Sequence, residues 1–165
     1  MFFSSLWDPG TAKMARAKAK SDDRSLYERD FNLWVEQQIA LLEASAFERL
    51  DLPNLIEEIA DMARSQRKAI RSDLVVLLTH LLKWQHQSQN RSTGWAGSIV
   101  EHRRRIREEI EDSPSLAGYP GEVFGRCYQA AREQAAAETG MPMTSFPETS
   151  PYTLERALDP DFLPD

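Results

Sequence analysis

The residues from Asn54 to Thr93 contain neither glycine nor proline, the two residue types that most often interrupt a helix. Apolar side chains recur through this stretch at steps of three and four, which places them on one side of an α-helix. The recurring positions are Leu55, Ile56, Ile59, Met62, Ile70, Leu74, Leu77, Leu78, Leu81 and Trp84. The pattern therefore predicts one long helix from Pro53 to Gln87.

The length of this helix is large for the chain. At 1.5 Å per residue it would be about 50 Å long, whereas a single globule of 165 residues is only about 40 Å across. Two solutions are open. The helix breaks in the polar stretch Ser65 to Asp73, with Ser72 as a second N-cap, or it protrudes and is covered by a second subunit. The polar stretch slightly favours the break, and the absence of a helix-breaking residue keeps the dimer as a rival.

Two capping patterns precede the long helix. Ser25-Leu26-Tyr27-Glu28 is a capping box, so a helix should begin there. Ser45-Ala46-Phe47-Glu48 repeats the pattern and predicts a short turn before Pro53. The apolar face expected for the first helix consists of Phe31, Trp34, Val35, Gln38, Ile39 and Leu42.

Two more helices should follow the long one. After a loop from Ser88 to Gly94, a third helix carries Trp95, Ile99, Ile106 and Ile110, and Ser113-Pro114 ends it. A fourth should run from about Pro120 to Thr139, with Gly140 as its left-handed cap. Its inward side chains are expected to be Val123, Phe124, Cys127, Tyr128, Ala131 and Ala135.

The last residues are rich in proline and should be mostly extended, with one short helix opened by Ser150-Pro151. The expected anchors of this tail are Phe146, Tyr152, Phe162 and Leu163. We therefore predict an all-α fold for residues 25–165: a single-domain bundle of about four main helices, one of them long, with an extended C-terminal tail. Residues 1–24 lack periodicity and are predicted to be a disordered extension, and Met14 is an alternative start to Met1.

The net charge and the cysteine content restrict the binding partners and the cellular compartment expected for the protein. A net charge of −6 favours solubility and argues against general affinity for nucleic acid or anionic membranes. The single cysteine, Cys127, excludes an internal disulfide and fits a reducing compartment. Neither a signal peptide nor a stretch of roughly 20 apolar residues is found. These features predict a cytoplasmic protein without a membrane partner.

Common catalytic motifs are missing from the sequence. GxxxxGK, GxGxxG and GxSxG do not occur, and neither do the helical metal pairs ExxH and HxxxH. We therefore predict no cofactor, no metal and no catalytic residues, which favours a protein that is not an enzyme.

One candidate pocket lies in the most apolar part of the chain. It comprises His80, Lys83, Trp84, Gln85 and Trp95. His80 and Trp84 are one helical turn apart, and burial would keep the imidazole neutral, as an acid or base requires. The simpler interpretation is a core histidine that bonds to backbone or a neighbour. Cys127 is similarly interpreted as a packed thiol.

A candidate interface lies on the third helix and comprises Arg103, Arg104, Arg105, Arg107 and Glu108. The pairs Arg104 with Glu108, Arg105 with Glu109 and Arg107 with Glu111 should cancel most of the positive field. The bases nevertheless precede the acids, which is the reverse of what the helix dipole prefers. We interpret the segment first as a solvated face, then as a protein interface, and last as a weak nucleic-acid site. Glu57, Asp61, Arg64, Lys68 and Arg71 form a second solvated face.

Several segments together resemble the bacterial family called domain of unknown function 29. They are SLYERDFNLWVEQQIALL, LDLPNLIEEIADM, LTHLLKWQ, EHRRRIREEIEDSPSL and ETGMPMTSFPETSPYTLERALDPDFLP, and they span nearly everything from Ser25 to Pro164. The resemblance implies an all-helical protein but no catalytic residues and no established activity.

The sequence supports three hypotheses for function. The preferred one is a helical protein-interaction module that self-associates, as a homodimer, or binds another protein. The alternative is a small-molecule- or metal-binding protein with its pocket at His80, Trp84 and Trp95. The third is weak nucleic-acid binding through Arg103 to Arg107.

Overall fold

A computed structural model of the protein describes residues 25–165, and every regular element within them is a helix. The predicted all-α fold is confirmed. These residues fall into two compact units, the first ending at Ile59 and the second beginning at Ala60. The disordered extension predicted for residues 1–24, and the choice between Met1 and Met14, lie outside the described residues. Among residues 25–165, no helix is both long enough and apolar enough to cross a membrane.

The first unit begins with two helices where one was expected, α2 (Leu26–Arg29) and α3 (Phe31–Glu43). Ser25 caps α2 as predicted, because its Oγ accepts the Glu28 amide at 3.3 Å. Asp30 then adopts extended backbone, and its carboxylate accepts the Leu33 amide at 3.0 Å. An aspartate competes well for the N-cap position, so it ends one helix and starts the next.

The turn predicted after α3 is the short 3-10 helix η1 (Phe47–Arg49), but Ser45 does not cap it. Ser45 instead has φ 53°, in the left-handed region. The Ser45 amide donates to the Leu42 carbonyl, and the Ala46 amide donates to the Leu41 carbonyl. This is the Schellman arrangement that usually takes glycine, so Ser45 closes α3 and does not open the next element.

The core of the first unit is small. Among its described residues only Trp34, Gln38 and Leu41 are buried. Trp34 Nε1 donates to Asp51 Oδ2 at 3.1 Å, and Gln38 Oε1 accepts the Asp51 amide at 2.8 Å. Tyr27 packs edge-on against Trp34, with ring centres 4.9 Å apart. Two side chains of α3 are thus fixed to the residue that precedes the long helix.

The long helix is α4 (Leu52–His86), and it runs for 35 residues without interruption. The break preferred in the stretch Ser65 to Asp73 is therefore wrong, and Ser72 lies within the helix. Polar side chains do not disturb a helical backbone when no glycine or proline is present. Residues up to Ile59 belong to the first unit and the rest of α4 belongs to the second.

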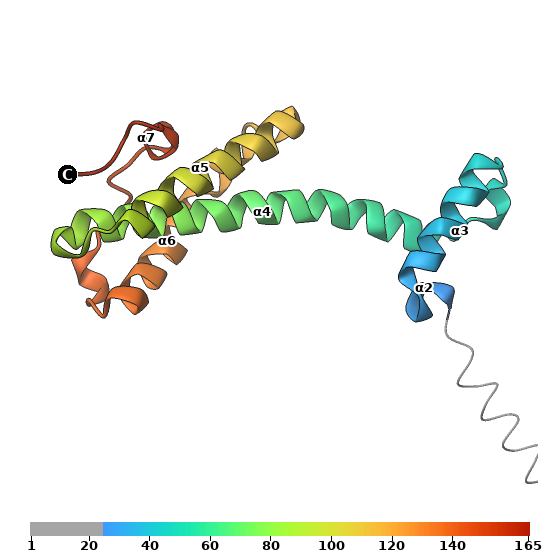
Figure 1. The fold of residues 1–165 in the computed structure, drawn as a ribbon, viewed down its shortest axis with the longest axis horizontal. Coiled ribbons are helices and arrows are strands. Elements are labelled where there is room, and N and C mark those ends of the chain that lie inside the picture. The colour runs from blue at the N-terminus through green and yellow to red at the C-terminus, as the bar shows by residue number, and fades with distance from the viewer. Residues whose placement is uncertain (1–24) are drawn as a thin grey trace, which may run out of the picture. The chain divides into compact units, whose positions relative to one another are not determined.

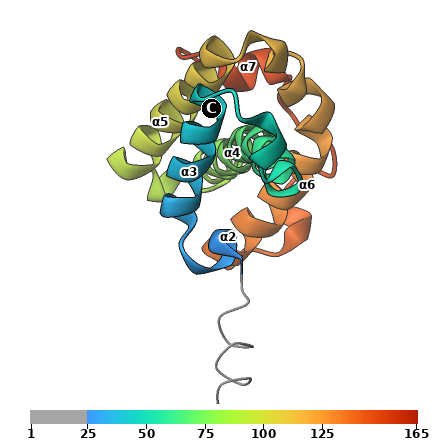
Figure 2. The ribbon, with the colours of Figure 1, turned by 90° about the vertical axis from the view of Figure 1, so that its right-hand side faces the viewer.

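In the second unit, α4 is surrounded by α5 (Thr93–Asp112), α6 (Tyr119–Thr139) and α7 (Leu154–Leu158) (Figures 1 and 2). The short 3-10 helices η2 (Ser88–Asn90), η3 (Pro114–Leu116) and η4 (Met143–Ser145) lie in the connections. The side chains at the centre of this core include Leu74, Leu77, Leu78, Leu81, Ile99, Ile106, Val123, Tyr128 and Ala131. The predicted inward face of α6 is confirmed, with Phe124 only partly buried.

Caps fix the ends of the helices in the second unit. Ser92 Oγ accepts the Trp95 amide at 3.3 Å and so starts α5. Gly140 closes α6 with φ 70°, as predicted. The tail helix α7 is capped by Thr153. Ser150 was expected to open α7, but its Oγ accepts the Tyr152 amide at 3.1 Å in the preceding turn. Of the expected tail anchors, Phe146 and Tyr152 are buried and Leu163 is exposed.

Candidate functional site

The five residues of the candidate pocket do not converge on one point. Lys83 is buried, and its Nζ lies 4.6 Å from the centre of the Trp95 ring. The same Nζ donates to Glu138 Oε2 at 2.6 Å. Lys83 and Trp95 are therefore brought together, with a carboxylate from α6 completing the group. This ion pair ties α4 to α6.

His80 lies one turn before Lys83 and is bonded to its own helix. Its Nδ1 is 2.9 Å from the Val76 carbonyl oxygen and 3.4 Å from Ser98 Oγ. Burial lowers the pKa of His80, which keeps the imidazole neutral. A neutral ring that donates to a carbonyl one turn earlier is the arrangement of a core histidine, the simpler of the two interpretations.

Trp84 and Gln85 hold other parts of the chain. The Arg91 guanidinium lies 5.2 Å from the centre of the Trp84 ring, and Arg91 Nε donates to the Trp84 carbonyl at 2.9 Å. Gln85 Oε1 accepts from the Tyr152 hydroxyl at 2.7 Å. These contacts position the loop after α4 and the C-terminal tail.

Arg103, the first residue of the candidate interface, is only 3% exposed. Its guanidinium donates to the carbonyls of Ala157 and Phe162, each at 2.8 Å, and to that of Pro160 at 3.4 Å. The guanidinium of Arg103 thus holds three backbone carbonyls of the tail against α5. Arg103 serves the interior of the second unit and is not part of a surface.

The other arginines of α5 are exposed and largely paired within the helix. Arg104 contacts Glu101 and Glu108, and Arg105 Nε donates to Glu101 Oε1 at 2.8 Å. The predicted pair of Arg104 with Glu108 is formed, whereas Arg105 bonds back to Glu101. The hydrogen bonds from Arg104 and Arg105 lower the pKa of Glu101 to about 2. Arg107 is exposed on the same helix.

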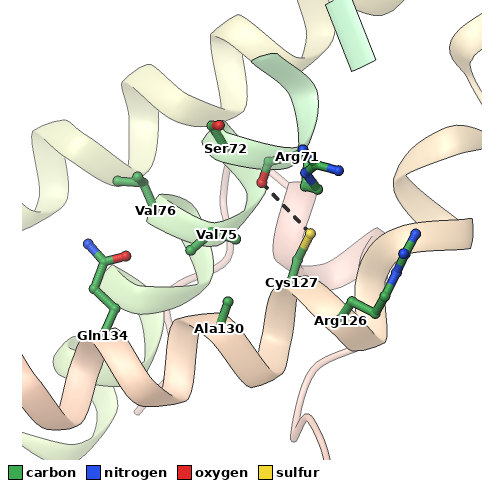
Figure 3. A pocket seen from close by; sticks show the side chains of 8 residues that line it. All are labelled: Arg71, Ser72, Val75, Val76, Arg126, Cys127, Ala130 and Gln134. Atoms are coloured by element: carbon green, nitrogen blue, oxygen red, sulfur yellow. Dashed lines mark hydrogen bonds between the residues drawn. The ribbon is translucent and has the colours of Figure 1, made fainter. Parts of the chain in front are cut away.

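A cavity of about 510 Å³ lies between α4 and α6, and we call it the α4–α6 pocket (Figure 3). From α4 it is lined by Arg71, Ser72, Val75 and Val76. From α6 it is lined by Arg126, Cys127, Ala130 and Gln134. Cys127 Sγ donates to the Arg71 carbonyl at 3.7 Å. Burial raises the pKa of this thiol, in keeping with the predicted packed cysteine.

Only one feature of the sequence pointed to this pocket. Arg71 has no acidic residue three or four positions away, although it was assigned to a face of ion pairs. On that face, Asp61 does pair with Arg64. Arg126 carries no such signal, because only the packing of α6 on α4 brings it to the pocket.

A third feature is a set of apolar side chains in the first unit that remain open to solvent. We call it the N-terminal apolar surface. Its members are 45% to 65% exposed: Phe31, Ile39, Leu42, Phe47, Leu52, Ile56 and Ile59. Phe31, Ile39 and Leu42 follow one face of α3, and Leu52, Ile56 and Ile59 follow one face of α4. Periodicity placed Phe31, Ile39, Leu42, Ile56 and Ile59 on inward helix faces, but within the described residues these side chains are exposed.

No group of three or more histidine, cysteine, aspartate or glutamate side chains in residues 25–165 is placed to hold a metal ion. Comparison with curated proteins and with solved structures found no match. Residues 26–163 do match the model of a family described as Domain of unknown function DUF29. Because the match covers most of the sequence, the chain belongs to that family.

Proposed function

We propose that the protein is a helical interaction module that pairs with a second copy of itself through the N-terminal apolar surface. The observation that carries the proposal is the exposure of the seven side chains of the N-terminal apolar surface, all within one small unit. An apolar helix face is complementary to a copy of itself, and two-fold dimers use one patch twice. The cytoplasmic setting expected from the sequence is part of this proposal.

The area of the surface suits such a dimer. A large apolar side chain has about 200 Å² to bury, so seven of them at roughly half exposure offer on the order of 700 Å². The largest apolar patch of a typical monomer covers about 300–600 Å². A standard interface takes about 800 Å² from each partner. The N-terminal apolar surface therefore exceeds what a monomer usually exposes and approaches what one side of a dimer needs.

The small core of the first unit gives independent support. Its described part runs only from residue 25 to 59, and Trp34 and Leu41 are its only buried apolar side chains. Units below about 40 residues rarely bury enough surface to be stable without a metal, a disulfide or a partner. Burial of the α3 and α4 faces against a second copy would supply the missing core.

The two other hypotheses have less support from the contacts. His80, Lys83, Trp84 and Gln85 are each bonded to backbone or to neighbouring side chains of the same chain. A nucleic-acid surface on α5 would need free cations. Arg103 donates to backbone carbonyls of the tail, and Arg104 and Arg105 contact glutamates.

Sedimentation equilibrium on the full chain tests the proposal. We expect a mass of twice 18.9 kDa at micromolar concentration. The double variant Ile56→Ser/Ile59→Ser should shift the protein to monomer, because it removes two apolar contacts from each side of the interface. A wild-type chain that stays monomeric at about 100 µM, near the Kd of a very weak complex, would disprove self-association.

A matched control distinguishes a specific interface from non-specific association through exposed apolar side chains. Val100 on α5 is 62% exposed, as open as Ile56, but it lies in the second unit. Val100→Ser should leave the dimer unchanged. If Val100→Ser weakens association as much as the double variant does, the N-terminal apolar surface is not the interface.

A further inference from the structure

Two arginines stand at the same end of the α4–α6 pocket without a counter-ion. Among residues 25–165, neither Arg71 nor Arg126 has a carboxylate within 4.0 Å, unlike Arg64, Arg104 and Arg105. Figure 3 shows their side chains on either side of Cys127, with Gln134 toward the opposite end. The positive charges of both arginines act on the Cys127 thiol, where they oppose the effect of burial on its pKa. The electrostatic effects of Arg71 and Arg126 are thus both felt at the Cys127 thiol.

Two guanidinium groups that are unpaired among residues 25–165 make their end of the cavity positively charged. The net charge is −6, so acidic side chains outnumber basic ones and could have neutralised both guanidiniums. Two like charges near one another repel, and a negative group between them would relieve that repulsion. Guanidinium groups also match the planar oxygens of carboxylates and phosphates. The positive charge at this end of the pocket therefore favours the binding of an anion.

Most of the remaining lining is apolar, although Ser72 and Gln134 are polar. Val75, Val76 and Ala130 line it beyond the arginines. Its volume of about 510 Å³ falls within the usual range for small-molecule sites. A simple inorganic anion would leave this apolar part open to water. The site is therefore better matched by a molecule with an anionic head and an apolar body.

We propose that the α4–α6 pocket binds a small amphiphile with an anionic head group, held between Arg71 and Arg126, and an apolar body that lies over Val75, Val76 and Ala130. The head group is a carboxylate or a phosphate monoester. All of these residues belong to the second unit. The inference therefore stands apart from the proposed dimer, and each can fail without the other.

Nuclear magnetic resonance of the ¹⁵N-labelled full chain tests this site, with sodium decanoate and decyl phosphate as the two probes below their micellar concentrations. We expect chemical-shift changes concentrated in residues 71–76 and 126–134. Decyltrimethylammonium keeps the apolar chain and reverses the charge, and acetate keeps only the head, so both should bind at least tenfold more weakly. Binding by either anionic probe supports the site, and the stronger of the two identifies the head group.

Variants separate the charge from the apolar body. Arg71→Gln/Arg126→Gln should weaken binding at least tenfold, because each arginine contributes a charged hydrogen bond to the head. Arg49→Gln/Arg107→Gln removes the same charge from exposed positions elsewhere and should leave binding unchanged. Ala130→Leu keeps both arginines but fills the apolar part of the pocket, so it should weaken the binding of decanoate and decyl phosphate. All five positions are exposed, so these variants should fold.

Three results would overturn the inference. The first is that neither anionic probe shifts residues 71–76 and 126–134 more than the rest of the chain. The second is equal affinity for decanoate and decyltrimethylammonium. The third is equal loss of binding in the Arg71/Arg126 and Arg49/Arg107 double variants, which would indicate attraction to the overall charge of the protein and no defined site.

Discussion

Arg103 is the side chain on which the C-terminal tail most depends. Arg103→Met keeps the apolar stem but leaves the carbonyls of Ala157, Pro160 and Phe162 without their donor. Hydrogen bonds to a charged donor contribute about 1.5–3 kcal/mol each, and not additively. We therefore expect the free energy of unfolding to fall by about 3 kcal/mol, measured by urea denaturation.

The neighbouring Arg104 provides the control for Arg103. It is exposed and bonds only to Glu101 and Glu108, so Arg104→Met should cost less than about 1 kcal/mol. A buried cation also carries a desolvation cost, which lowers the pKa of Arg103. If Arg103→Met were as stable as the wild type, this cost would outweigh the three hydrogen bonds and the tail would be held by packing alone.

His80 should make the stability of the protein depend on pH. Burial lowers its pKa below the ordinary value of 6.5 in the folded chain. As the pH falls through about 6.5, the unfolded chain takes up a proton and the folded chain does not. Stability falls wherever the unfolded state binds more protons, so the free energy of unfolding should decrease between about pH 7.5 and 5.5. His80→Gln should make that decrease smaller, as urea titrations at the two pH values will measure.

All other titratable groups, His86 among them, are present in both the wild type and the His80 variant, so the difference between the two slopes isolates His80. The pKa of His86 is also lowered by burial, and His86 is therefore expected to maintain part of the decrease in the variant. Identical slopes in the two proteins would mean that His80 accepts a proton equally well in the folded chain.

Roles of single residues were only partly predictable. The sequence placed His80 and Cys127 in the core, because both lie among apolar residues at helical spacing. Arg103 could not be separated from Arg104 and Arg105, because a run of adjacent arginines on a helix does not reveal which of them points inward at tail carbonyls. That distinction depends on where the tail packs, which is a long-range contact.

At the scale of elements, Gly140 and Gly125 should respond oppositely to alanine. Gly140 closes α6 with φ 70°, where an alanine side chain costs about 1–2 kcal/mol. Gly125 lies within α6, and a β-carbon there would meet nothing within 4 Å. Gly125→Ala should therefore raise the free energy of unfolding by up to about 1 kcal/mol. Thermal or urea unfolding of the two variants checks both signs, and a stabilising Gly140→Ala would contradict the cap.

The helices themselves were largely predictable from local signals. Periodicity, caps and the absence of glycine and proline predicted the ends of α4 and α6 to within one residue, although the break that was preferred within α4 does not occur. The errors near α3 came from short polar residues, which can either start a helix or end one. Asp30 caps α3 inside what looked like one helix, and Ser45 takes a left-handed position usually held by glycine. Local pattern identifies such residues as breakers or caps but does not say which end of a helix they serve.

At the scale of the whole molecule, the sequence predicted which positions are apolar but not which of them are covered. Ile56 and Ile59 follow the same helical repeat as Leu77 and Leu81, yet the first pair is exposed and the second pair is buried. Periodicity records only that a face is apolar. Whether that face meets the rest of the same chain or a second copy depends on how much core each unit can assemble, and the first unit assembles little.

This difference predicts how backbone amides should exchange with solvent. Amides of α3 should exchange through opening of the first unit, whose core is small, whereas those of residues 74–83 should exchange only on unfolding of the second unit. The proposed pairing through the N-terminal apolar surface would stabilise the first unit by mass action, so protection of residues 31–43 should rise with protein concentration. Hydrogen exchange by mass spectrometry at about 1 µM and 100 µM, which span the range of weak to moderate dimers, will measure this. Protection of α3 that is high and independent of concentration would show that the first unit is stable without a second copy.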